Sequence, residues 1–167
     1  VMGWADGSPA LDYTVNNSVG YPMMTGAGPD PVNHVLPAWD LLTGAYAAFA
    51  MLAAIRRRDD TGEGSEVRIP LSDVAIGTVA NLGGVAELLT SGANRPRLGN
   101  AVYGLFGRDF VTADGVRTMI VVVTPRQWAN LVAALKLEDA IAALEAQCGV
   151  SFAKDDGLRF THRDTLF

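Results

Sequence analysis

The feature that most constrains the fold is the apolar run from Leu41 to Ile55, which contains no charged residue. Pro37 and Asp40 precede this run, and three arginines (56–58) follow it. Proline suits the first helical position, an acid suits the first turn, and basic residues suit the last turn. We therefore predict a helix over residues 36–58. Its uncharged part is shorter than the roughly 20 residues of a membrane span, so we expect a helix buried in protein and no membrane contact.

Composition narrows the classes of protein that fit. Of the 167 residues, 49% are hydrophobic and 19% are charged, which predicts extensive burial, either inside the fold or against something absent from this chain. The net charge of −5, with no basic block longer than residues 56–58, argues against a nucleic-acid partner. The single Cys148 excludes an internal disulfide and is typical of a reducing, cytoplasmic compartment. The chain starts without Met and without an obvious first element, and it ends in the middle of a sequence pattern. We therefore expect it to be a piece of a longer polypeptide.

The first part of the chain combines turn formers with long helical patterns. Residues 1–33 are rich in Gly, Pro, Asn and Asp but also carry many apolar side chains, which predicts an irregular loop packed over a site. We predict a short strand at 66–69, because its residues are partly β-branched, and a second apolar helix at 71–91.

The segment NRPRLGN, residues 94–100, is the best candidate for a boundary between two lobes. Beyond it, two β-rich runs joined by Asp114–Gly115 predict a hairpin within 108–123, followed by helices at 125–135 and 137–147. The predicted fold class is α/β, or α+β for this piece alone. We divide it into 1–92, with the long apolar helices, and 93–167, a smaller α+β lobe.

Few residues carry recognisable chemistry. His34 and His162 are far apart in sequence and Cys148 has no CxxC partner, so we expect no metal site. Neither a phosphate-binding loop nor a GxSxG nucleophile motif is present. The lone acid Asp40 remains, and two interpretations of it stay open on spacing alone. It is either a helix-end charge or a nucleophile at the edge of a dry pocket.

Asp40, Thr43 and Gly44 are spaced to share one helix face, which predicts a small polar notch in an apolar helix. Glycine costs a helix about 1 kcal/mol relative to alanine. Either a closely packed helix or an approaching ligand would explain why Gly44 lacks a side chain.

The order of the central segments resembles the signature of the family III CoA-transferases. The likeness lies in Asp40, in Thr43–Gly44, in the alanine-rich helix to Arg58, and in TGEG at 61–64 continuing to Asp73. Downstream, RPRLGN and FVTADGVRTMIVVVTPRQWANLVAAL resemble the entry to the family's small domain. The resemblance runs from about residue 10 onward and is most specific over 36–75.

This resemblance implies that Asp40 is a nucleophile that carries CoA as a thioester between two carboxylates. Coenzyme A then enters as part of the substrate, and no metal or redox cofactor is needed. The resemblance further implies an acyl-CoA and a carboxylate as substrates and a homo-oligomeric enzyme. The family's N-terminal half and its C-terminal part are absent from this chain. We therefore expect the 167-residue chain alone to be inactive.

Two segments, 11–26 and 99–110, resemble the branch of the family that moves CoA between the carboxylates of a branched C5 dicarboxylic acid. Where formyl-CoA transferases have a glycine-rich lid, this chain has AVYGLFG after Gly99–Asn100, and we expect a bulkier lid. A non-catalytic, oligomeric binding module derived from the same fold is the alternative.

Candidate substrate contacts come from both lobes, although turn stabilisation or plain solvation would equally explain several of them. Trp39 is expected in the core, and Arg95 is a weaker candidate for an anion contact. The candidate substrate-binding residues are Tyr13, Asn16, Asn17, His34, Arg97, Asn100, Tyr103 and Gly104.

Overall fold

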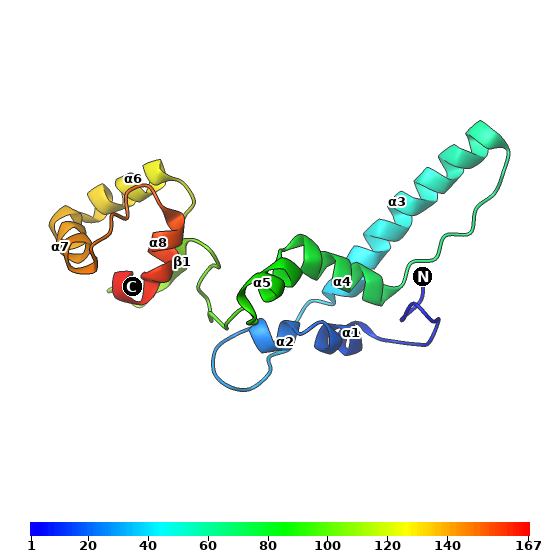
Figure 1. The fold of residues 1–167 in the computed structure, drawn as a ribbon, viewed down its shortest axis with the longest axis horizontal. Helices are drawn as coiled ribbons and strands as arrows, with labels where there is room; N and C mark the ends of the chain where they lie inside the picture. Colours follow the sequence, from blue (N-terminus) through cyan, green and yellow to red (C-terminus); the bar gives the residue numbers. More distant parts are fainter. The chain divides into compact units, whose positions relative to one another are not determined.

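The computed structural model describes residues 1–167, which form two units, Val1–Arg97 and Leu98–Phe167 (Figure 1). The units divide after Arg97, which lies within the predicted boundary segment 94–100. Arg97 belongs to the first unit because its guanidinium donates to the backbone carbonyls of Met23, at 2.7 Å, and Gly28, at 2.8 Å. These bonds fix the loop that follows α2.

Five helices build the first unit, and three local predictions for it need correction. The segment 1–33 is not wholly irregular, because it contains two short helices. The predicted strand at 66–69 is absent because no neighbouring strand pairs with it, and only an isolated bridge joins Met2 to Pro70. The predicted helix at 71–91 is two helices, bent by 59° at Gly83, whose φ is 81°. The helices are α1 (Asp12–Ser18), α2 (Tyr21–Met24), α3 (Ala38–Thr61), α4 (Leu71–Asn81) and α5 (Gly84–Ser91).

The core of the first unit is small and lies where α1, α3 and α4 meet. Its buried apolar members are Val15, Trp39, Leu71 and Ala75, so the prediction that Trp39 is a core residue is confirmed. Only the beginning of α3 takes part in this core. Beyond it α3 extends away from α1 and α4 (Figure 1).

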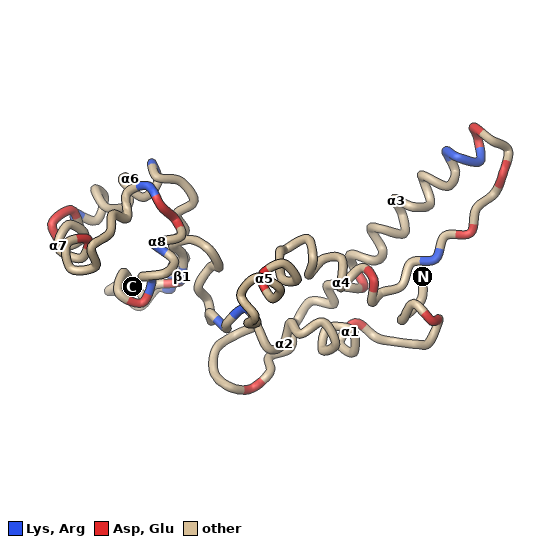
Figure 2. The backbone as a smooth tube through the Cα atoms, viewed as in Figure 1, with Lys and Arg blue, Asp and Glu red and all other residues tan.

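The expectation that α3 is buried is therefore wrong for this chain, since most of its apolar side chains face solvent. Phe49 is 75% exposed and Leu52 is 67% exposed. By length and composition α3 would also suffice to cross a membrane, as would α4 and α5 taken together as one bent span. Apart from Asp40 in the first turn, the charged residues of α3 lie at its far end (Figure 2), and the uncharged run before them is shorter than a bilayer core requires.

The second unit contains the predicted hairpin. Strands β1 (Phe106–Val111) and β2 (Arg117–Val122) pair antiparallel, with Phe106 opposite Val122. Gly115 supplies the left-handed conformation of the turn, with φ of 81°. Helix α6 (Pro125–Leu135) begins with a capping box between Thr124 and Gln127. Helices α7 (Glu138–Cys148), α8 (Asp156–Thr161) and α9 (Arg163–Leu166) complete the unit.

The core of this unit explains why its first strand begins at Phe106. Phe106 is buried with Val122, Trp128 and Phe152, so it is not part of the predicted lid. A Cβ on Gly107 would lie 3.1 Å from a methyl group of Val102, so this glycine serves close packing within the unit. In the predicted lid segment, 101–107, the residues before β1 include one glycine in the left-handed conformation, Gly104, with φ of 80°.

Candidate active site

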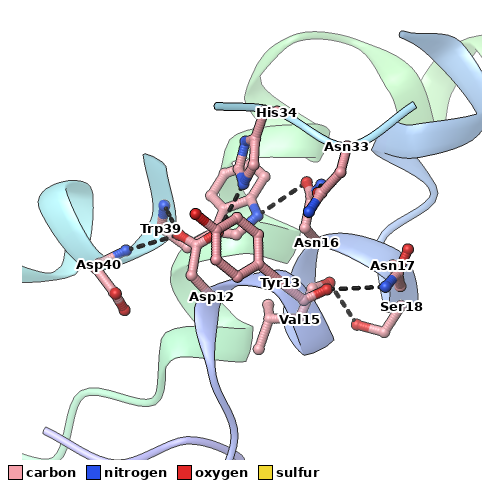
Figure 3. Close-up of polar contacts among 10 residues, drawn as sticks. All are labelled: Asp12, Tyr13, Val15, Asn16, Asn17, Ser18, Asn33, His34, Trp39 and Asp40. Atoms are coloured by element: carbon pink, nitrogen blue, oxygen red, sulfur yellow. Dashed lines mark hydrogen bonds and ion pairs between the residues drawn. The ribbon is translucent and has the colours of Figure 1, made fainter. Parts of the chain in front are cut away.

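The first turn of α3 has no cap from its own sequence. Pro37 occupies the N-cap position, and no side chain there accepts a hydrogen bond. Instead Asp12 of α1 places one carboxylate oxygen, Oδ2, against the turn. This oxygen accepts from the backbone N–H of Trp39 at 2.7 Å and of Asp40 at 3.2 Å (Figure 3). A carboxylate at this end also complements the positive end of the helix dipole.

The other oxygen of Asp12 faces His34. Nε2 of His34 lies 2.6 Å from Oδ1, and Tyr13 packs edge-on against the imidazole at a centroid separation of 5.7 Å. Asp12 is 2% exposed, whereas the His34 side chain is 22% exposed. A buried carboxylate is tolerated only when hydrogen bonds replace its lost water, and here three donors surround it.

Asn16 lies one turn after Asp12 and extends the same buried network. Its Oδ1 accepts from the indole Nε1 of Trp39 at 3.1 Å, and its Nδ2 donates to Oδ1 of Asn33 at 2.9 Å. Tyr21 packs edge-on against Trp39, with centroids 5.3 Å apart. Burial raises the pKa of the Tyr21 phenol, so this side chain is neutral at physiological pH. The network therefore fixes Trp39 from two sides.

Asp40 itself lies in the first turn of α3, as the sequence predicts, but its side chain is exposed and points away from Asp12 (Figure 3). The predicted notch is only partly right. Thr43 is buried, and its hydroxyl has no hydrogen-bond partner. No atom lies within 4 Å of the position that a Cβ on Gly44 would take, so no close helix neighbour in this chain explains the glycine.

The structure thus gathers Tyr13, Asn16 and His34 around the turn that carries Asp40. Asn17 is not part of this group, because it is exposed and donates to the Tyr13 carbonyl of its own helix. The guanidinium of Arg97 donates to backbone carbonyls of the loop after α2, and its substrate contact stays a prediction.

Arg95, the weaker anion candidate, pairs with Glu87 at 2.9 Å. Asn100, Tyr103 and Gly104 belong to the second unit, and their substrate contacts stay predictions. There hydrogen bonds from Arg117 and, to a smaller extent, from Asn100 lower the pKa of the Asp109 carboxyl, while Tyr103 packs on Phe160.

Sequence reasoning missed Asp12 and Asn33. The signal for Asp12 was available, because Asp12 and Asn16, like Val15 and Val19, are spaced four residues apart as on one helix. The abundant turn formers around them hid this short helix. Asn33 carried no local signal, since its role depends on a contact with α1.

Comparison with known proteins agrees with this arrangement of elements. The model of CoA-transferase family III matches residues 2–165, and the chain belongs to this family. A 2-methylfumaryl-CoA isomerase of Chloroflexus aurantiacus is 48% identical over 99% of the chain, which spans 41% of that relative's length. A succinyl-CoA:mesaconate CoA-transferase of Haloarcula hispanica is 30% identical over 92% of the chain and 38% of its own length.

Solved structures share the fold. A CAIB/BAIF family protein from Brucella suis matches 99% of this chain and 42% of its own, with a TM-score of 0.67 and 24% identity. A protein from Mycobacterium tuberculosis covers 98% of this chain and 40% of its own, with a TM-score of 0.68 and 22% identity. The mixed fold, mainly helical with a two-stranded antiparallel sheet, is therefore that of the CoA-transferase family.

Neighbouring asparagines offer a direct test of the buried network. We expect Asn16→Ala to lower the free energy of unfolding of the first unit by about 1–3 kcal/mol, because it leaves the buried indole N–H of Trp39 without an acceptor. Asn17→Ala is the matched control, since Asn17 is exposed and bonds only within α1, and we expect a change below about 0.5 kcal/mol. Hydrogen exchange of the α1 and α3 amides measures both. Equal effects of the two substitutions would contradict the network.

Proposed function

We propose that this chain is the nucleophile-bearing part of a family III CoA-transferase that moves CoA between carboxylates through a thioester on Asp40. The observation that carries the proposal is the exposed carboxylate of Asp40 on a turn whose backbone is held by a buried acid. A carboxylate used only as a helix-end charge would be redundant here, because Asp12 already caps the turn. Family membership and the relatives' printed activities support the same reaction class.

The reaction follows from the chemistry of a carboxylate nucleophile. The carboxylate of Asp40 attacks the thioester carbonyl of the acyl-CoA, which forms a mixed anhydride and expels CoA thiolate. The thiolate then attacks the Asp40 carbonyl of the anhydride, which releases the donor carboxylate and leaves an aspartyl thioester. The acceptor carboxylate repeats these two steps in reverse. Covalent relay divides one difficult exchange into easier steps.

The position of Asp40 at a helix N-terminus suits this chemistry. The positive end of the helix dipole stabilises the oxyanion that forms when the Asp40 carbonyl is attacked. Anhydrides and thioesters hydrolyse, so water must be scarce around Asp40. Asp40 is exposed in this chain, and we propose that other segments of the complete enzyme cover it together with the apolar side of α3.

We further propose a CoA ester of a branched C5 dicarboxylic acid, such as mesaconyl-CoA (2-methylfumaryl-CoA), as the substrate. The support is the 48% identity to the Chloroflexus aurantiacus isomerase along nearly the whole chain. Such an enzyme would move CoA between the two carboxylates of one acid.

Substitution of Asp40 tests the nucleophile. In the complete enzyme we expect Asp40→Asn and Asp40→Ala to lower turnover by several orders of magnitude, because no carboxylate remains to form the anhydride. The melting temperature should change little, since a helix-end charge contributes at most about 1 kcal/mol. Hydroxylamine added with acyl-CoA should trap a hydroxamate on the peptide containing Asp40, detected by mass spectrometry. Normal turnover in Asp40→Ala, or the adduct on another acid such as Asp73, would exclude this role.

The open space beside Gly44 gives a second test. We expect Gly44→Ala to stabilise α3 by about 1 kcal/mol in this chain, because nothing occupies the added methyl's place. In the complete enzyme the same change should lower turnover or raise KM if the substrate approaches this face.

Gly77→Ala is the matched control, since Gly77 also lies within a helix with no atom within 4 Å of an added Cβ. Unchanged kinetics in Gly44→Ala would show that no ligand comes close to this side of α3. A fall in the melting temperature of the complete enzyme would instead assign the space to another protein segment.

Competing substrates test the acyl group. We expect the complete enzyme to isomerise mesaconyl-CoA with a far higher kcat/KM than it shows for transfer from formyl-CoA to oxalate. Exchange of labelled CoA, followed by chromatography of the products, measures both reactions. A preference for formyl-CoA and oxalate would overturn the substrate but leave the reaction class intact.

A further inference from the structure

Asp12 differs from every other acid in the first unit by its surroundings. It is the one carboxylate there that is buried, and its two oxygens serve different elements. Oδ1 meets His34, on the loop before α3, and Oδ2 accepts from Trp39 and Asp40 in the first turn of α3. One side chain of α1 thereby ties together the loop and the helix on either side of Pro37.

The direction of a helical side chain follows from the φ and ψ angles of its own turn. The first turn of an α-helix has free N–H groups and frays unless a side chain binds them. In α3 the N-cap is Pro37, which provides no acceptor, so the conformation at Asp40 depends on the distant oxygen of Asp12. His34, on the other oxygen, limits rotation of the carboxylate and keeps Oδ2 on the two amides.

We propose that Asp12 is a positioning residue, which holds the backbone of the Asp40 turn so that the Asp40 carboxylate meets the thioester carbonyl in a reactive geometry, and that His34 locks Asp12 in place. This inference rests on the proposed role of Asp40 as nucleophile. Because Asp12 is buried, it acts through the backbone of Asp40 and not by contact with substrate. A displacement of about 1 Å at a reacting group can lower turnover by about 100-fold, so the loss of this tether should affect kcat more than binding.

The variants separate positioning from stability. In the complete enzyme we expect Asp12→Ala to lower kcat by about 100-fold with KM changed by less than about threefold. Asp12→Asn keeps an oxygen for the two amides and an NH2 group for His34, and we expect it to recover kcat to within about tenfold of wild type. His34→Leu, which frees Oδ1 but leaves the amide contacts possible, should fall between these two.

Two controls belong to the same unit. Val15→Ala removes buried methyl groups from the core between Asp12 and Asn16, so it should lower the melting temperature while kcat stays within about twofold. Asp30→Ala removes an exposed acid and should alter neither quantity. In the 167-residue chain, hydrogen exchange of the Trp39 and Asp40 amides should accelerate at least tenfold in Asp12→Ala but not in Asp30→Ala.

The outcomes are distinguishable from those that test Asp40. Hydroxylamine trapping on Asp40 in the wild type, with slower trapping in Asp12→Ala and recovery in Asp12→Asn, would support the inference. Trapping on Asp40 at equal rates in wild type and Asp12→Ala, or a loss of kcat in Val15→Ala as large as in Asp12→Ala, would overturn the inference alone. Trapping on another residue in the wild type would overturn the proposed function and this inference with it.

Discussion

The hydrogen bonds from Trp39 and Asp40 to the carboxylate of Asp12 join the two elements on which the rest of the first unit depends. Without them α3 would begin at a proline with no acceptor for its free amides, and α1 would bury a charge without sufficient partners. The carboxylate of α1 therefore binds the free amides of α3, and these amides stabilise the buried carboxylate. Val15 and Trp39 complete the contact with apolar burial, so the polar tether and the small core lie side by side.

Elements with strong local signals were predictable from the sequence. Asp114–Gly115 between two β-rich runs marked the hairpin, and Thr124–Pro125 marked the start of α6, because turn and cap preferences act within a few residues. Asp40 was placed in the first turn of α3 for the same reason. Asp12 was missed because the turn formers around it hid the short helix α1 on which it lies. The strand at 66–69 was wrong because a β-branched run forms a strand only where a partner strand exists.

The exposed side of α3 shows what sequence periodicity cannot decide. The run from Leu41 to Ile55 is apolar on all sides, which is typical of a helix buried all round, yet this chain buries only its beginning. Composition indicates that such an apolar surface must be covered, but it does not identify the segment or partner that covers it. The chain spans 41% of the length of its Chloroflexus aurantiacus relative, so an enzyme of that size has further segments with which to cover this surface.

The proposed reaction at Asp40 requires that water be excluded, and the exposed apolar side of α3 likewise requires a covering surface. Asp12 holds the backbone of Asp40, but the Asp40 carboxylate is open to solvent, where the anhydride of the proposed reaction would be hydrolysed. The tether requires only α1 and α3, both present in this chain, whereas the exclusion of water requires surfaces that this chain does not provide. Positioning of Asp40 and exclusion of water from it are therefore separate requirements. The 167-residue chain should keep the orientation of Asp40, as seen in its amide exchange, even where it cannot sustain turnover.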